Sequence, residues 1–297
     1  MQLIKALALF QATFINAMSI DSSFENIWLT LPKTPKLPQV ESISEMQNIN
    51  GVDLWSRQFN KNEDKTPIVL VHGGLGYSDY FGDVITKLVK HGHYVIAVDR
   101  RGHGKSKFNE NDIFTYELFA DDIDKQLKSL GVKEYYAVGW SDGAATFIAA
   151  LQDSNLKTSI KKAFLFAGFM VPTDTNPQFE KSDIFKDFVL RCTKEYAENH
   201  PEDPSKFALF AKKVDTMERN LPQFTEEGLK AIDGSKVAIV EAEYDEAVKR
   251  EVPEKLHQAI KDSQLITLKK VSHFAPMQDS VSFTQEIETF FFKDLLV

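Results

Sequence analysis

The sequence Gly139-Trp140-Ser141-Asp142-Gly143 lies between an apolar run at residues 135–138 and an alanine-rich run at residues 143–151. The first run has the composition of a buried strand, and the second that of a closely packed helix. A chain that passes from strand to helix here must turn sharply, and glycine is needed where a Cβ would meet neighbouring backbone. The pattern G-x-S-x-G therefore predicts a strained turn that lifts the hydroxyl of Ser141 above the edge of a sheet.

Similar apolar runs recur along the chain, and helical patterns separate them. Nearly continuous apolar runs are typical of parallel strands that are buried on both faces. Their alternation with helices predicts the α/β class, with a mostly parallel central sheet flanked by helices. Leu118, Ile123 and Leu127 share one face of a helix that should end at Gly131. The expected strands are residues 67–71, 94–98, 135–138, 163–169, 237–242 and 265–268.

The alternation stops between Phe169 and Lys236, where only helical stretches occur, at residues 183–199 and 204–218. This segment is too long for a simple crossover, and we predict a helical lid over the carboxyl ends of the strands. Its Phe185 and Phe188 are candidate substrate-binding residues, unless they only pack the lid onto the core. The expected division is a core of residues 51–170 and 236–297, a helical cap of residues 171–235, and an extended lead-in and first strand region at residues 20–50.

The amino terminus has the order of a secretory signal peptide. One basic residue, Lys5, precedes an apolar stretch from Ala6 to Ile15, and small residues follow at Ala17 and Ser19. We predict that residues 1–19 are a signal peptide and that the protein is secreted. The alternative is a retained amphipathic helix on a cytoplasmic protein. The apolar stretch is too short to span a bilayer, so no stable membrane insertion is expected.

Composition excludes several classes of partner. The formal net charge of -8 argues against nucleic acid, because a phosphate-binding surface needs clustered lysine and arginine. Neither a CxxC pair nor an HExxH helix is present, so no metal and no cofactor are predicted. The expected partner is a small-molecule substrate.

A serine hydroxyl is a poor nucleophile unless a base takes its proton. His273 stands just after the last expected strand and is the predicted base. The imidazole needs a carboxylate that fixes its tautomer, and Asp245, after the strand at residues 237–242, is the predicted acid. Three other carboxylates are alternatives: Glu243, Glu246 and Asp174. Together these residues predict a catalytic set of Ser141, Asp245 and His273.

Attack on a carbonyl also requires hydrogen-bond donors for the tetrahedral oxyanion. One predicted donor is the backbone N–H of Asp142, the residue after the nucleophile. The second should come from the glycine-rich loop after the first parallel strand, His72-Gly73-Gly74-Leu75. Gly74 is the predicted donor there, with Leu75 as the alternative.

These motifs, together with the loop Asp99-Arg100-Arg101-Gly102-His103-Gly104-Lys105-Ser106, resemble the α/β-hydrolase superfamily from about Gly51 to the end of the chain. The resemblance implies the α/β-hydrolase fold. It also implies a serine hydrolase that cleaves a small carboxylic ester through an acyl-enzyme. The turn Gly-Trp-Ser-Asp-Gly is similar to that of the valacyclovir hydrolase branch, in which the acidic residue after the nucleophile helps to bind a substrate ammonium group.

That similarity implies that Asp142 binds substrate and favours α-amino esters. The alternative is a structural role, or a role in the polarity of the pocket. Trp140, within the same turn, is a further candidate substrate-binding residue. Other activities also use this set of residues: a peptidase resembling prolyl iminopeptidases, and a carbon–carbon bond hydrolase. A ligand-binding protein without turnover is the remaining alternative, although a pure binder has no need of nucleophile, base, acid and oxyanion loop together.

Overall fold

The computed structural model describes residues 26–293, so the predicted signal peptide at residues 1–19 lies outside the described residues. The described strands form one eight-stranded sheet in the order β1-β2-β4-β3-β5-β6-β7-β8. Strands β3 to β8 pair in parallel, which confirms the predicted mostly parallel sheet. Their bounds are β3 Ile68–Val71, β4 Val95–Val98, β5 Tyr135–Trp140, β6 Ile160–Phe166, β7 Val237–Ala242 and β8 Gln264–Leu268.

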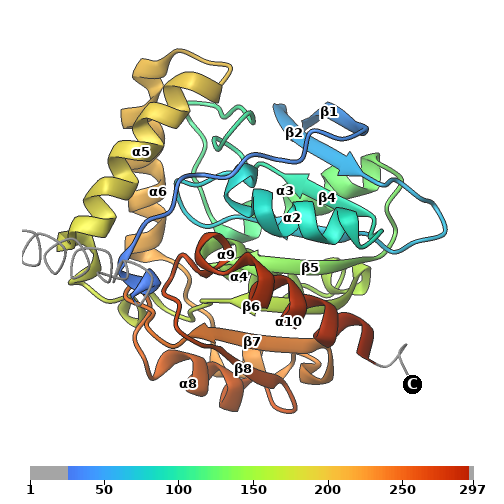
Figure 1. Cartoon of the computed structure of the whole chain (residues 1–297), viewed down its shortest axis with the longest axis vertical. Helices are drawn as coiled ribbons and strands as arrows, with labels where there is room; N and C mark the ends of the chain where they lie inside the picture. The colour runs from blue at the N-terminus through green and yellow to red at the C-terminus, as the bar shows by residue number, and fades with distance from the viewer. Residues whose placement is uncertain (1–25, 294–297) are drawn as a thin grey trace, which may run out of the picture.

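Helices cover both faces of this sheet, as Figure 1 shows. Helices α2 (Gly82–Lys90) and α10 (Ser280–Phe292) pack together on one face and bury an apolar cluster there. Helices α3 (Tyr116–Ser129), α4 (Asp142–Gln152) and α8 (Val252–Ala259) bury a second cluster on the other face. A short helix, α9 (Ala275–Gln278), precedes α10. The sheet is therefore buried on both sides, which explains its nearly continuous apolar strands.

The antiparallel hairpin at the start of the sheet is a feature that the apolar runs did not reveal. Strands β1 (Ser42–Ile49) and β2 (Val52–Phe59) pair antiparallel, and β2 also pairs antiparallel with β4. Asn50 and Gly51 form the turn with φ of 51° and 74°. An Asn-Gly pair between alternating segments is a strong hairpin signal, since both residues tolerate positive φ. Strand β1 lies within the predicted first strand region at residues 20–50, and it stands out little in the sequence because it is a mostly exposed edge strand.

The segment between β6 and β7, residues 171–235, is called the insertion below. It contains α5 (Asp183–Asn199), α6 (Phe207–Asn220) and α7 (Glu226–Lys230), and both predicted helical stretches are present. Helices α5 and α6 stand at one end of the sheet in Figure 1. Their buried residues recur at helical spacing on one face of each helix. These residues are Phe188, Cys192 and Tyr196 on α5, and Phe210, Val214 and Met217 on α6.

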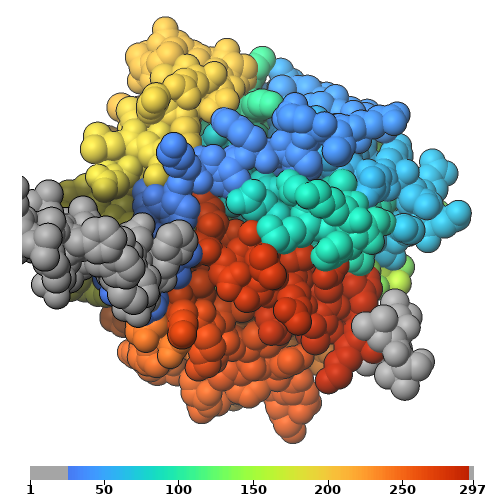
Figure 2. All heavy atoms as spheres, in the orientation of Figure 1, coloured from blue at the N-terminus to red at the C-terminus, as the bar shows by residue number. Residues whose placement is uncertain are grey.

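The described part of the lead-in crosses between the insertion and the end of the chain. Figure 2 shows it in blue between the yellow α5 region and the red C-terminal region. The Arg191 guanidinium of α5 donates hydrogen bonds to the carbonyls of Leu31 and Pro32, and the Gln278 amide donates to the carbonyl of Thr30. Over residues 26–293, no helix combines the length and apolar character needed to cross a membrane.

Candidate active site

Ser141 occupies the predicted strained turn between β5 and α4. Its φ is 55° and its ψ is -115°, a conformation that costs a non-glycine residue free energy and is concentrated at functional sites. The flanking glycines permit it, because a Cβ on Gly139 would overlap the backbone of Gly143 and a Cβ on Gly143 would overlap the carbonyl of Val71. Among the described residues, nothing forms a hydrogen bond with the Ser141 hydroxyl. Ser141 lines a cavity that lies between the core and the insertion.

His273 lies in the loop after β8, and its ring contacts the carboxylate of Asp245 in the loop after β7. The Nδ1 atom is 3.1 Å from both carboxylate oxygens, so Nδ1–H donates to Asp245 and Nε2 is left as an acceptor. The carboxylate is itself held, since Oδ1 accepts the N–H groups of Ala247 and Val248 at 2.9 Å each. Parallel strands deliver their carboxyl ends to one edge of the sheet, and that is why these distant residues meet.

None of the alternative acids contacts the His273 ring. Glu246 accepts the backbone N–H of His273 at 3.0 Å, and its other oxygen accepts the hydroxyl of Ser272 at 3.3 Å. Glu243 accepts the N–H of Lys270 in the turn after β8. Asp174 accepts the N–H groups of Met170 and Val171, within its own turn. The geometry therefore places Asp245 at the imidazole and the other three carboxylates elsewhere.

The electrostatic surroundings of His273 favour its protonated form. Burial by itself disfavours the imidazolium, but the charge of Asp245 and its hydrogen bond outweigh burial and raise the pKa of His273 above its usual value. The charges of Glu246 and Asp142 act in the same direction. A base with a raised pKa accepts a proton more readily, which suits the role predicted for His273.

The glycine-rich loop after β3 lies directly against the turn at Ser141. A Cβ placed on Gly73 would come within 3.3 Å of the Cβ of Ser141. Leu75 has a φ of 57°, a left-handed conformation that is unusual for leucine. In the described part of the chain, the N–H groups of Gly74, Leu75 and Asp142 donate to no acceptor, and all three residues line the cavity. The predicted donors are thus gathered beside Ser141.

The cavity has a volume of about 590 Å³ and lies between the carboxyl ends of the strands and the insertion. The three predicted aromatic residues, Trp140, Phe185 and Phe188, all line it. The ring of Trp140 is 5.9 Å from that of His273, and the ring of Phe188 is 5.3 Å from that of Phe274. Core and insertion therefore share one mostly apolar cavity that contains Ser141 and His273.

The carboxylate of Asp142 has surroundings that the sequence did not reveal. Its side chain is 2% exposed, and Oδ1 accepts the hydroxyl of Tyr116 at 2.9 Å. Its Oδ2 lies 3.5 Å from Nη1 of the fully buried Arg100. Glu218, from α6, adds a second carboxyl group beside it. Burial, reinforced by Asp142, raises the pKa of Glu218 well above its usual value. Arg100 belongs to a motif that the sequence displayed, but nothing in the sequence linked Tyr116 or Glu218 to the site.

The chain is similar to known proteins in both sequence and fold. A family model described as the alpha/beta hydrolase fold matches residues 66–201. The sn-1-specific diacylglycerol lipase ABHD11 of Danio rerio is 30% identical over 113 residues, which are 37% of this chain and 35% of that protein. The bifunctional esterase/perhydrolase DCH of Acinetobacter calcoaceticus is 27% identical over 166 residues, which are 52% of this chain and 56% of that protein. The chain thus matches about a third to just over half of the length of these curated relatives.

Among solved structures, the meta-cleavage product hydrolase CumD of Pseudomonas fluorescens IP01 has the same fold. It is 17% identical, has a TM-score of 0.69, and the match covers 85% of this chain and 98% of that one. The sheet order, the strained turn after β5 and the family match agree with one another. The chain has the α/β-hydrolase fold, and its residues 66–201 match the family model of that fold.

Proposed function

We propose that this protein is a serine hydrolase that cleaves small carboxylic esters through a covalent acyl-enzyme. One observation carries the proposal: Ser141, on a strained turn with an unpartnered hydroxyl, and His273, held by Asp245, line the same cavity. These are the nucleophile and the oriented base that acyl transfer needs. A hydrogen bond between them can form when substrate binds, since catalytic hydrogen bonds often tighten only in the complex.

In the proposed reaction, Oγ of Ser141 attacks the ester carbonyl carbon and its proton passes to Nε2 of His273. The carbonyl oxygen becomes an oxyanion that accepts the N–H groups of Gly74 and Asp142. The carbon–oxygen bond to the alcohol then breaks, and the alcohol leaves with the proton from His273. Water attacks the acyl carbon, gives a proton to His273, and the acid departs as Ser141 regains its proton. Asp245 stabilises the imidazolium in both halves of the reaction.

The lining of the cavity supports a small substrate with apolar groups on both sides of the ester. Phe169, Phe179 and Phe185 contribute aromatic surface, and the volume of about 590 Å³ lies within the range of sites for small molecules. Of the two roles that the sequence left open for Asp142, we favour the one in pocket polarity. Its carboxylate already has a buried counter-ion in Arg100, which opposes selection of a substrate ammonium group.

Labelling with a fluorophosphonate and turnover of p-nitrophenyl acetate test the proposal on the wild type and Ser141→Ala. We expect one phosphonyl adduct on the wild type and none at this site in the variant, with kcat lower by roughly 10⁵–10⁶-fold. The matched control is Ser235→Ala, an exposed serine of the insertion, which should leave both readouts unchanged. Labelling or turnover of Ser141→Ala at the wild-type level would contradict the mechanism.

A comparison of substrates distinguishes ester hydrolysis from peptidase activity and tests the role of Asp142. It compares the acetate ester with an α-amino ester and with an amino-acid anilide of equal size. Faster turnover of the anilide would favour the peptidase alternative. A preference for the amino ester that disappears in Asp142→Asn would restore the ammonium-binding role of Asp142.

A further inference from the structure

The loop after β4 places a buried cation behind the proposed oxyanion site. The side chain of Arg100 is 0% exposed, and its Nη2 donates a hydrogen bond to the carbonyl oxygen of Gly73 at 2.9 Å. Its Nη1 lies 3.5 Å from Oδ2 of Asp142, and its guanidinium lies over the ring of Phe119, 5.0 Å from the centroid. One guanidinium thus contacts both segments whose N–H groups are proposed to bind the oxyanion.

His72 supplies a second donor to the same carbonyl. Its Nε2 accepts the backbone N–H of Arg100 at 3.1 Å, so the ring proton sits on Nδ1, which donates to the carbonyl of Gly73 at 2.9 Å. Burial holds the pKa of His72 well below its usual value, and the charge of Arg100 lowers it further. The ring is therefore neutral and keeps this tautomer, and two donors fix the Gly73 carbonyl.

The hydrogen bonds to the Gly73 carbonyl also fix the direction of the Gly74 N–H, because both groups belong to one peptide unit. A trans peptide holds its C=O and its N–H in opposite directions. Because the Gly73 carbonyl points toward Arg100 and His72, the N–H of Gly74 points away from them. Gly73 packs against the Cβ of Ser141, and Gly74 lines the cavity. The free N–H of Gly74 is thereby directed to the side of the loop that is open to a ligand.

We infer that Arg100 is a positioning residue for the oxyanion hole. It acts through the Gly73–Gly74 peptide on one side and through Asp142 on the other, without touching substrate. Its hydrogen bond to the Gly73 carbonyl polarises that peptide and strengthens the N–H of Gly74 as a donor. The inference rests on the proposed function, since an oxyanion forms only if Ser141 attacks a carbonyl.

The charges around Arg100 fit this role. Asp142 balances the guanidinium, while burial and the charge of Asp142 raise the pKa of Glu218 well above its usual value and so favour its neutral form. The point beside Gly74 where a Cβ would lie is 3.1 Å from Oδ2 of Asp142 and closer still to Oε1 of Glu218. In its protonated form Glu218 can donate to Asp142, which reduces the negative charge beside Gly74.

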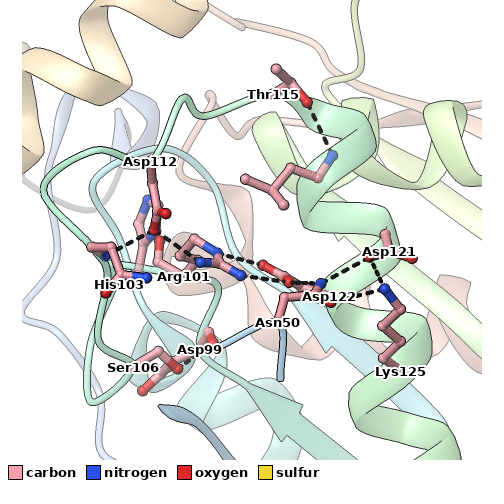
Figure 3. A network of polar contacts seen from close by, with 12 residues as sticks. Asn50, Asp99, Arg101, His103, Ser106, Asp112, Thr115, Asp121, Asp122 and Lys125 are labelled. Carbon is pink, nitrogen blue, oxygen red and sulfur yellow. Dashed lines mark hydrogen bonds and ion pairs between the residues drawn. The ribbon is translucent and has the colours of Figure 1, made fainter. Parts of the chain in front are cut away.

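The adjacent residue, Arg101, offers a matched control, because it is equally buried and lies in the same loop. Its Nε and Nη2 bind the two oxygens of Asp122 at 2.7 Å and 2.8 Å, and its Nη1 binds Asp112 at 2.9 Å. Figure 3 shows this network running from Arg101 through Asp122 to Asn50. Arg101 does not line the cavity. The two arginines are equally buried and differ only in their partners: Arg100 contacts Gly73 and Asp142, whereas Arg101 binds Asp122 and Asp112.

The test compares Arg100→Met with Arg101→Met in the full chain. For Arg100→Met we expect kcat to fall about 10–100-fold with KM little changed, below the roughly 10²–10³-fold cost of deleting an oxyanion-hole donor. Affinity for a phenylboronic acid, which forms a tetrahedral adduct on the serine, should fall by a similar factor. Arg101→Met should lower thermal stability but change neither kcat nor boronate affinity. Equal kcat and boronate affinity for folded Arg100→Met and wild type would overturn the inference.

Each single variant leaves a buried carboxylate unpaired and can fail to fold. The double variants R100M/D142N and R101M/D122N remove both charges of a pair and keep every backbone N–H. The first should fold and still bind boronate weakly, whereas the second should bind it as the wild type does. Fluorophosphonate labelling separates the two proposals. A wild type that fails to label rejects the function, whereas labelling with undiminished boronate affinity in R100M/D142N rejects only the role of Arg100.

Discussion

The two walls of the cavity are built in different ways. On the core side, directional hydrogen bonds from several elements hold the polar groups, as at Asp245, which contacts His273, Ala247 and Val248. The insertion side also contributes polar residues such as Glu218, but it meets the His273 ring with aromatic surface: the rings of Phe179 and Phe185 are 5.0 Å apart, and that of Phe179 is 5.9 Å from His273.

This difference suits the two sides of the cavity to different roles, one in holding reacting groups and one in selecting a substrate. A hydrogen bond has a short range and a preferred direction, so the core wall can hold reacting groups to within fractions of an ångström. Apolar contacts are non-directional and tolerate changes of shape. The core wall is therefore suited to chemistry, and the insertion wall is suited to selecting the size and shape of a substrate.

The largest expected effect comes from breaking the core wall at Asp245. Asp245→Asn keeps the shape but loses the charge and favours the wrong tautomer of His273, so kcat should fall roughly 10⁴-fold. Steady-state kinetics on an activated ester measure this. The matched control is Glu246→Gln, one residue away, whose carboxylate accepts the backbone N–H of His273 and the hydroxyl of Ser272 but makes no hydrogen bond with the imidazole. An equal loss in both variants would mean that the segment acts as a whole and that Asp245 has no special part.

A change in the insertion wall should alter selectivity instead. Phe185→Ala removes aromatic surface from the cavity, and the ratio of kcat/KM between hexanoate and acetate esters should change by about 10–100-fold. The kcat for acetate should stay near the wild-type value. Leu190→Ala, on the same helix at 69% exposure, is the control and should leave the ratio unchanged. A large fall in kcat for acetate in Phe185→Ala would break the proposed division between the two walls.

Two buried tyrosines, one in the core and one in the insertion, compare a hydroxyl that has a hydrogen-bond partner with one that has none. Tyr116 donates to Asp142, so Tyr116→Phe should lower the free energy of unfolding by about 1.5–3 kcal/mol. Over the described residues, the hydroxyl of Tyr196 on α5 has no hydrogen-bond partner. Tyr196→Phe should therefore change that free energy by less than about 0.5 kcal/mol or increase it slightly. Urea unfolding of both variants measures the two values, and equal losses would contradict the comparison.

The smallest expected effect is a displacement of the acid limb of the pH profile. Because the pKa of His273 is raised, kcat/KM should lose its base on the acid side at a pH above the usual imidazole value of 6.5. In Asp245→Asn, burial dominates and this limb should move to lower pH. The same raised pKa stabilises the folded state below the unfolded pKa of His273, and this contribution is lost as pH rises through the folded pKa. An acid limb that does not move in Asp245→Asn would show that another group controls it.

Local sequence patterns predicted the parts of the candidate site that follow strand ends, with more than one candidate for the acid. Ser141, Asp245 and His273 each come just after an apolar run, and parallel strands bring such positions together at one edge. The hairpin at Asn50-Gly51 was not predicted, because strand β1 has too little apolar character to stand out. Tyr116 and Glu218 were not readable, because each reaches Asp142 from a helix whose own pattern reports only its apolar face.

The sequence by itself determined the fold class, the order of the strands and helices, and the turn that exposes Ser141, because these depend on short-range patterns of apolar residues and glycine. Only the tertiary structure decided which carboxylate meets His273, what surrounds the charge of Asp142, and that Arg100 and Arg101 hold different networks. Those outcomes depend on distances between residues that are far apart in the chain, and two adjacent arginines look identical until the fold gives each its own neighbours.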